Sequence, residues 1–355
     1  MREGVVEIDG SRGEGGGQIL RTSLALSMIT GKPLLMTNIR AGRAKPGLRR
    51  QHLACVHAAA QLSDAEVYGA EVGSKFLDFR PREIQDRTLD IDIGSAGSTT
   101  LVVQTILVAA IVAKHPLRAV VHGGTHNPMA PPFEFLSRVF LPHLAAMGAR
   151  VTLELDRHGF ASGGGGRASH DELTEHRGQL TLVVEPGELR PIDVIETQPI
   201  RERHATAILA RLPTHVAERE LGVVRELLGW SKIECEVRDV TDAGGPANVL
   251  MLEVDRGSVS GRELVTGIGE KGLRAEVVAE RACRAMQEYL DADVPVGEHL
   301  ADQLLLPLAL AGGGRFRAAT LSLHSTTNID TIRAFIDVAI RAEDVRAGVV
   351  DVIVG

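Results

Sequence analysis

Residues 6–18 read Val-Glu-Ile-Asp-Gly-Ser-Arg-Gly-Glu-Gly-Gly-Gly-Gln, and this pattern returns later in the chain. Val6–Asp9 alternates apolar and acidic residues, which is typical of a strand with one buried face. A glycine-rich loop follows, and residues 19–30 are mostly apolar over the length of a helix. The stretch therefore predicts a strand, a glycine loop and a helix in succession.

The same landmarks return 83 residues further along the chain. Leu89–Asp92 runs into Gly94-Ser-Ala-Gly97, and residues 99–113 are again an apolar stretch of helical length. The pairs Pro33-Leu34 and Pro116-Leu117, which each open a second strand, keep the same offset. Several landmarks at one offset indicate a repeated unit, which we predict to run β–glycine loop–α–β–loop–α–β–β.

A third copy of this unit requires an insertion between its first strand and its first helix. Leu180–Glu185 is predicted as that strand and residues 301–311 as that helix. Residues 318–323 then form a second strand that ends at His324, and a helix follows over residues 329–340. The residues in between alternate helical and strand periodicities, which predicts a small inserted α+β domain.

The predicted fold class is therefore mixed α/β, or α+β, with two domains. The large domain takes residues 1–186 and 286–355, and the inserted domain takes residues 187–285. The three units cover about residues 1–85, residues 86–178, and residues 179–186 together with 286–355. If the units pack around a shared axis, their loops converge and bring together Glu14, Arg40, Arg43, Gln104, His122, His126 and His324.

Charge is distributed unevenly along the chain. The 355 residues carry 46 acidic and 39 basic side chains, and the net charge of −7 argues against a general nucleic-acid coat. Between Glu14 and Asp64, however, there is no acidic residue. This segment predicts either a binding site for phosphates or RNA backbone, or a solvated basic face. Its seven basic residues are Arg21, Lys32, Arg40, Arg43, Lys45, Arg49 and Arg50.

The sequence argues against export and against a membrane span. The N-terminus lacks the apolar stretch of a secretory signal, and the longest apolar run, residues 101–113, is shorter than the ~20 residues that cross a bilayer. The three cysteines suit neither a disulfide framework nor a zinc site. We therefore expect a cytoplasmic protein without a membrane partner. Its 38 glycines predict many tight loops, among them a flexible turn at residues 163–166.

The loop Gly13-Glu-Gly-Gly-Gly-Gln18 matches neither the dinucleotide-binding fingerprint nor the P-loop motif. Its glycines let backbone N–H groups approach an anion closely, and the helix that follows adds a favourable dipole. The alternative is a tight turn that requires positive φ angles. Glu14 would repel phosphates unless a cation lay between them, so it is a candidate ligand for Mg²⁺ or Mn²⁺.

Most of the 13 histidines suit structural roles, but two lie in reactive settings. His324 is predicted to end a strand and to enter a Ser-Thr-Thr-Asn turn, which would expose its imidazole. His299 begins the sequence His-Leu-Ala-Asp-Gln303, where Asp302 could hold an imidazole in one tautomer. A neutral imidazole can attack phosphorus, so both residues are candidate nucleophiles.

Seven segments resemble motifs of the RNA 3′-terminal phosphate cyclase family, in family order and over essentially the whole chain. They are residues 13–21, 40–47, 51–52, 94–97, 123–128, 297–307 and 324–329. The resemblance implies three repeated units with a small domain inserted in the third. It also implies ATP-dependent conversion of RNA 3′-phosphate ends into 2′,3′-cyclic phosphates. The implied intermediates are histidine–AMP and RNA-adenylate, and the by-products are AMP and diphosphate.

The resemblance also implies roles for individual residues. His324 matches the nucleophile, and Glu14 matches the metal-binding glutamate. His299 stands where relatives often carry a tyrosine that can stack on adenine, which leaves the affinity for adenine open. The residues that match phosphate-handling positions are Arg21, Arg40, Arg43 and Gln51. Those that match ATP-contacting positions are Gln104, His299, Leu300, Ala301, Asp302 and Gln303.

Two other functions stay open, and a homodimer is a further expectation. A catalytically silent RNA-binding or ribosome-assembly relative would use the basic segment without chemistry, although the presence of His324 argues against it. An enolpyruvyl-transferase-like enzyme would use a similar unit for phosphorylated substrates, but six units are then expected and three can be traced. A covalent AMP adduct would separate the cyclase from both alternatives.

Overall fold

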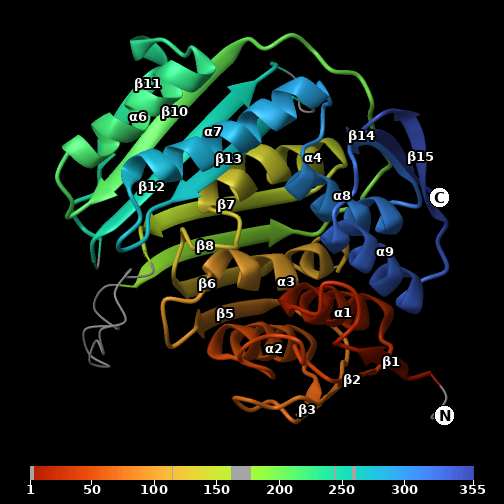
Figure 1. The fold of residues 1–355 in the computed structure, drawn as a ribbon. Helices are drawn as coiled ribbons and strands as arrows, with labels where there is room; N and C mark the ends of the chain where they lie inside the picture. The colour runs from red at the N-terminus through yellow and green to blue at the C-terminus, as the bar shows by residue number, and fades with distance from the viewer. Residues whose placement is uncertain (1–3, 114, 161–176, 244, 258–260) are drawn as a thin grey trace.

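A computed structural model describes residues 4–113, 115–160, 177–243, 245–257 and 261–355 (Figure 1). The glycine turn predicted at residues 163–166 lies outside these ranges. Within them, the strands form four sheets of four strands, and helices pack on the sheets. The predicted mixed α/β class is therefore confirmed. No helix in the described part of the chain is both long and apolar enough to cross a membrane.

The first sheet follows the glycine-rich N-terminal stretch. Its strands lie in the order β1 (Val6–Asp9), β2 (Leu34–Thr37), β4 (Leu77–Arg80) and β3 (Glu66–Tyr68). Only β1 and β2 are parallel, and the other pairs are antiparallel. Helix α1 (Gly17–Thr30) follows the glycine loop, and α2 (Arg50–Ser63) precedes β3. The predicted strand at residues 6–9 and helix at residues 19–30 are confirmed.

The second sheet has the same order and the same strand directions. Its strands are β5 (Arg87–Asp92), β6 (Leu117–Gly123), β8 (Gly178–Glu185) and β7 (Arg150–Arg157), with only β5 and β6 parallel. Helix α3 (Thr99–Val112) follows its glycine loop. Its second helix begins as a π-helix, η1 (Phe135–Phe140), and continues as α4 (Leu141–Ala146).

The prediction that Leu180–Glu185 begins a third unit is wrong. These residues belong to β8, which pairs with both β6 and β7 in the second sheet. The third sheet instead starts with β9 (Asp193–Val194), which is parallel to β14 (Gly314–Ala319). An apolar strand pattern does not reveal its partner, and a two-residue strand has no periodicity to detect. The sheet is completed by β16 (Val349–Val354) and β15 (Ile340–Arg346).

The sequence predicted that His324 ends a strand, and this prediction is wrong. His324 lies in the first turn of α9 (Leu323–Phe335), which begins six residues before the predicted helix at residues 329–340. The side chain of Ser322 accepts a hydrogen bond from the backbone N–H of Ser325 and so caps the helix. This cap starts a helix in a polar sequence that by composition favours a turn. Helix α8 (Glu298–Leu310) precedes β14.

The fourth sheet and two helices form the inserted part, at the top of Figure 1. The sheet has the order β11 (Cys235–Asp239), β10 (Glu202–Ala210), β12 (Ala247–Asp255) and β13 (Arg262–Ile268). Helices α6 (His215–Leu228) and α7 (Ala275–Ala292) pack on it around a separate apolar core. The predicted domain limit at residues 285 and 286 falls inside α7, which stays with the inserted sheet throughout.

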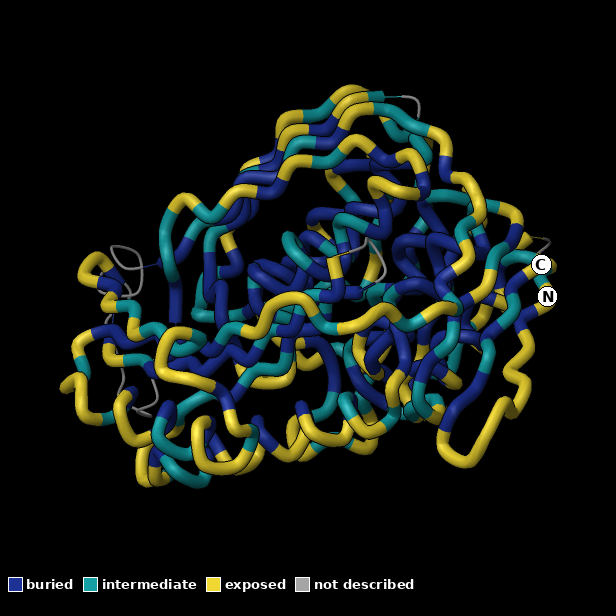
Figure 2. The backbone as a smooth tube through the Cα atoms, turned by 90° about the horizontal axis from the view of Figure 1, so that it is seen from above, coloured by how far each residue is buried: buried dark blue, intermediate teal, exposed yellow. Residues whose placement is uncertain are grey.

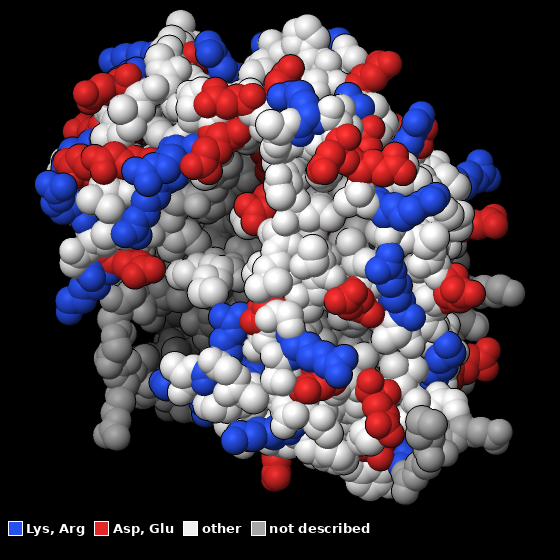
Figure 3. Space-filling model, turned by 45° about the vertical axis from the view of Figure 1, so that its right-hand side comes forward, with Lys and Arg blue, Asp and Glu red and all other residues white. Residues whose placement is uncertain are grey.

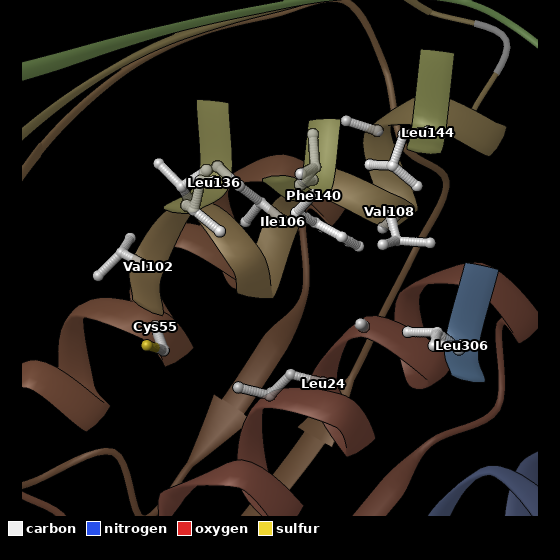
Figure 4. Close-up of a cluster of buried hydrophobic side chains, with 14 of the residues drawn as sticks. Leu24, Cys55, Val102, Ile106, Val108, Leu136, Phe140, Leu144 and Leu306 are labelled. Carbon is white, nitrogen blue, oxygen red and sulfur yellow. The ribbon is translucent and has the colours of Figure 1, made fainter. Parts of the chain in front are cut away.

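The main core joins helices from distant parts of the chain. Figure 4 shows Leu24 of α1, Cys55 of α2, Ile106 of α3, Phe140 of η1 and Leu306 of α8 in one apolar cluster. Figure 2 shows the resulting gradient, in which buried residues occupy the interior and exposed residues follow the outer loops. Burial of these side chains holds α1, α3 and α8 in a fixed arrangement. This arrangement in turn positions the polar residues on the same helices.

Stability should depend on pH through Glu220, which is buried in α6. One carboxylate oxygen accepts a 2.8 Å hydrogen bond from Asn248 Nδ2, and the other has no hydrogen-bond partner. Burial raises the pKa of Glu220 to about 7, although Asn248 and Arg219 act in the opposite direction. The unfolded chain therefore loses a proton near pH 4.5 that the folded chain keeps to about pH 7. The free energy of unfolding falls as the pH rises through this window.

We expect Glu220→Gln to raise the free energy of unfolding at pH 8 by on the order of 2 kcal/mol, and to have little effect at pH 4.5. Denaturant titrations at the two pH values measure this difference. Glu226→Gln, at an exposed position on the same helix, is the matched control and should show no such gain. Equal stability of Glu220→Gln and the parent chain at pH 8 would contradict the prediction.

Candidate active site

A pocket opens where α1, α3, η1, α8 and α9 meet. The five elements come from residues 17–335, so the pocket exists only in the folded chain. Figure 3 shows one face of the molecule, where a hollow separates the upper and lower parts and charges of both signs surround it. The pocket is lined by Gln18, Arg21, Thr22, Ala25, Gln104, Val108, Phe140, Asp302, Gln303, Leu306 and Asn328.

His324 lies next to this pocket. Its side chain is 55% exposed, and its Nδ1 atom is 2.7 Å from Gln18 Oε1 and 3.9 Å from Glu14 Oε2. The nitrogen of the same Gln18 amide contacts Asp302, since Gln18 Nε2 donates a 2.5 Å hydrogen bond to Asp302 Oδ1. One imidazole nitrogen is thus engaged by the protein, and Nε2 of this accessible side chain is the nitrogen left to contact a ligand.

Asp302 is held by hydrogen bonds from two helices. Asn328 Nδ2 donates to both the backbone oxygen and Oδ1 of Asp302 at 3.0 Å, in addition to the bond from Gln18. Burial raises the pKa of the Asp302 carboxyl, while Gln18, His324, Arg21 and Asn328 act to lower it. A buried carboxyl at this position can hold neighbouring donors in place or bind a ligand hydroxyl.

Glu14 forms an ion pair inside the glycine loop. Its Oε2 atom is 2.5 Å from the guanidinium of Arg43, and only 5% of the Glu14 side chain is exposed. Gly13 has φ +56°, and a Cβ at this position would overlap Thr327 of α9. A Cβ at Gly16 would overlap the Glu14 carboxylate. These two glycines therefore let the loop pack closely against α9 and its own acidic residue.

Positive charge gathers beside this loop. Burial lowers the pKa of Arg40, and the neighbouring charges of Arg43 and Arg49 lower it further, with Glu14 acting against them. Burial and the charges of Arg40, Arg21 and Arg49 lower the pKa of His52 to about 3, so His52 is neutral at pH 7. Several guanidinium groups thus lie around one carboxylate, and this local excess of positive charge favours a phosphate ligand.

Two of the predicted phosphate-handling residues also shape the loops. Arg40 has φ +52°, and its NH1 atom donates to the backbone oxygens of Lys45 and Gly47 at 2.8 and 2.9 Å. Gln51 Oε1 accepts a 2.8 Å hydrogen bond from the backbone N–H of Ser98. Gln51 therefore connects α2 to the start of α3, and the acceptor atom of its amide is already in use.

The predicted ATP-contacting residues fall into two groups. Gln104, Asp302 and Gln303 line the pocket, and Gln303 Oε1 is buried with no hydrogen-bond partner. His299 is exposed in the first turn of α8, one turn before Asp302. The side chains of Leu300 and Ala301 are buried in the core, so only their backbone groups can face a ligand.

The sequence predicted that His126 would join the other loop residues at one site, and this prediction is wrong. The His126 side chain is fully buried, with Nε2 2.8 Å from Glu134 Oε2 and Nδ1 2.8 Å from Thr125 Oγ1. His122 instead pairs with Asp90 at 3.0 Å. Both side chains therefore make contacts within residues 90–134, whereas Glu14, Arg43 and His324 do come together.

Sequence reasoning missed Gln18 and Asn328 as site residues. Both lie within helices, and their contacts join α1, α8 and α9, which are far apart in the chain. Gln18 ends the glycine loop motif and Asn328 ends the Ser-Thr-Thr-Asn sequence, so both lay within stretches already singled out. No periodicity marks them, because their role depends on the packing of the helices.

Known proteins identify the family. The model of the family "RNA 3′-terminal phosphate cyclase" matches residues 12–342. A protein named RNA 3′-terminal phosphate cyclase from Ectopseudomonas mendocina is 48% identical over 340 residues, which cover 96% of this chain and 95% of the relative. A protein of the same name from Pseudomonas fluorescens is 45% identical over 352 residues, which cover 99% of this chain and 98% of the relative. The chain therefore belongs to the RNA 3′-terminal phosphate cyclase family.

A third relative of the same name, from Koribacter versatilis, is 44% identical over 336 residues, which cover 94% of this chain and 91% of the relative. The resemblance predicted from the sequence is thus confirmed, and with it the prediction that the chain is an enzyme of this class.

Proposed function

We propose that the chain converts RNA 3′-terminal phosphates into 2′,3′-cyclic phosphates at the expense of ATP, with His324 as the nucleophile. The observation that carries this proposal is the placement of His324. Its exposed imidazole has Nδ1 engaged by Gln18 and lies between the pocket and the positively charged loop. This arrangement suits an enzyme that joins a nucleotide to an anionic second substrate.

The reaction proceeds in three displacements. Nε2 of His324 attacks the α-phosphorus of ATP, which forms a P–N bond and releases diphosphate. An oxygen of the RNA 3′-phosphate then attacks the same phosphorus, so that the P–N bond breaks and the imidazole is regenerated. Finally the 2′-OH attacks the 3′-phosphorus and closes the ring, while AMP leaves and the hydroxyl proton passes to solvent or a base. The need for a 2′-OH restricts the last step to RNA.

The polar pocket residues of α3 and α8 bind the nucleotide in this proposal, whereas Arg21 of the same pocket faces the RNA phosphate. Gln104, Asp302 and Gln303 offer polar contacts from two helices, and the unpaired Gln303 oxygen is an acceptor for a ligand hydroxyl or amine. His299 stacks on or borders the base at the exposed start of α8, and Leu300 and Ala301 contribute backbone groups. Arg21, Arg40, Arg43 and Gln51 receive the RNA 3′-phosphate.

Glu14 would bind a divalent cation, Mg²⁺ or Mn²⁺, only together with phosphate, because Arg43 already pairs with its carboxylate and the local charge is positive. Its carboxylate is an oxygen donor of the kind that such ions prefer, and it lies beside the proposed phosphate path. In the described ranges no group of three or more His, Cys, Asp and Glu residues is placed to hold an ion. Glu14 would therefore share the ion with phosphate oxygens and water, and the ion would neutralise phosphate charge.

We also propose that the large domain consists of three repeated units and that the inserted domain interrupts the third. The shared order and directions of the first, second and third sheets support this reading. The domain limits then move to about β9 and the start of α8. A homodimer and a cytoplasmic location stay predictions.

The test is incubation of the purified chain with α-labelled ATP and Mg²⁺, followed by a denaturing gel. An acid-labile, base-stable AMP adduct is expected, because a phosphoramidate on histidine has this lability. RNA with a 3′-phosphate should then discharge the adduct and gain a cyclic end. A folded protein that forms no adduct with either Mg²⁺ or Mn²⁺ would favour the silent RNA-binding alternative.

A further inference from the structure

The packing of α1 against α9 places two pairs of polar residues opposite each other. Gln18 and Thr22 lie four residues apart on α1, and His324 and Asn328 lie four residues apart on α9, so each pair shares one helix face. The hydrogen bonds Gln18–His324 and Thr22–Asn328 cross between the helices at 2.7 and 2.9 Å. Asp302 of α8 contacts the middle of this set.

The contact between Asn328 and the backbone oxygen of Asp302 decides the donor and the acceptor in each of these hydrogen bonds. Asn328 contacts the backbone oxygen of Asp302, which can only accept, so the contacting atom of Asn328 must be Nδ2. The same Nδ2 donates to Asp302 Oδ1, and Thr22 Oγ1 donates to the remaining amide oxygen of Asn328. Asp302 Oδ1 therefore accepts from Asn328, and in the ionised carboxyl, or in one protonated on Oδ2, it can only accept from Gln18 as well.

The next amide must follow the same direction. Gln18 faces an acceptor in Asp302 Oδ1, so the atom it presents there is Nε2. Its Oε1 atom must then face His324 Nδ1. A carbonyl oxygen can only accept, so Nδ1 of His324 must carry the proton in the neutral imidazole. The lone pair is left on Nε2.

We propose that Gln18 is a positioning residue. Its amide donates to Asp302 and accepts from His324, and this direction fixes the His324 tautomer whose Nε2 is the nucleophile. The effect of the tautomer on catalysis rests on the proposed function, but the tautomer itself is a property of the free protein. An imidazole without such a partner would divide between two tautomers, and only one of them presents a lone pair at Nε2.

The test reads the tautomer directly. The protein is labelled with ¹⁵N-histidine and studied without ATP or RNA, and the His324 signals are assigned by their loss in His324→Gln. Nδ1 is expected to be protonated in the parent chain. Gln18→Met removes both amide groups, so a mixture with protonated Nε2 is expected. Gln18→Glu keeps an acceptor towards Nδ1 and should retain the parent tautomer.

Gln104→Met is the matched control, because it changes a glutamine of the same pocket that has no hydrogen bond to His324 in the described contacts. It should leave the tautomer unchanged. In parallel, the rate of adduct formation at saturating ATP is expected to fall roughly 10- to 100-fold in Gln18→Met, with a much smaller change in the KM for ATP.

Two failures are distinguishable. Protonated Nε2 in the parent chain, or an unchanged tautomer in Gln18→Met, would overturn the role of Gln18 even if the AMP adduct forms normally. Protonated Nδ1 in a parent chain that forms no adduct would overturn the proposed function and leave the tautomer assignment standing.

Discussion

His324→Ala should abolish the AMP adduct completely while the protein stays folded. The side chain is more than half exposed, and alanine is the strongest helix former, so α9 should persist. The cap of α9 also remains, since it depends on Ser322 and Ser325. In the proposed reaction the imidazole of His324 forms the P–N bond, so its loss removes the first displacement and with it every later step.

The measurement is the amount of labelled AMP that stays with the protein on a denaturing gel, with thermal unfolding as the check on folding. His57→Ala is the matched control, because His57 is also an exposed histidine on a helix. It should form the adduct at the parent rate. An adduct that survives in His324→Ala would show that another residue is the nucleophile.

Arg43→Ala should slow transfer of AMP to an RNA 3′-phosphate by about 100-fold, which corresponds to the ~3 kcal/mol of a strong charged hydrogen bond. Two effects act in the same direction. A phosphate ligand loses a cation, and the buried Glu14 carboxylate loses its ion-pair partner and repels the incoming anion. Arg43→Lys keeps the charge but not the two contacts that NH2 makes to Glu14, so an intermediate rate is expected.

The rate is best followed in a single turnover from the isolated adduct, because this separates RNA transfer from the reaction with ATP. Arg12→Ala removes one positive charge from an exposed position in the same loop and serves as the control for net charge. Comparable slowing in Arg12→Ala and Arg43→Ala would mean that the overall field, rather than the Arg43 contact, drives the effect.

The elements with clear periodicity were predictable from the sequence, and those defined by their partners were not. Val6–Asp9 alternates as a half-buried strand does, and α1 and α3 are long apolar runs. By contrast, β8 has the pattern of any buried strand, and only its pairing with β6 and β7 decides its sheet. The start of α9 depends on a single serine cap.

The candidate site divides in the same way. Glu14, Arg43 and His324 lie in stretches whose composition is unusual, so they could be found without coordinates. The link between them could not, because Gln18 and His324 are separated by 306 positions and meet only through the packing of α1 on α9. Convergence failed for His126, whose motif resembles a binding loop although its imidazole is satisfied inside the core.

The pairing of β9 with β14 has a consequence for the order in which the molecule is made. These strands are separated by the whole inserted part, so the third sheet has to wait until the ribosome has produced residues beyond Gly314–Ala319. Domains tend to fold from the N-terminus as they emerge, and the first two sheets can assemble earlier. Helix α1 nevertheless lacks its α9 neighbour until Phe335 has been synthesised. The pocket is therefore among the last parts of the protein to form, and in the proposed reaction nascent chains that still lack α9 also lack the nucleophile His324.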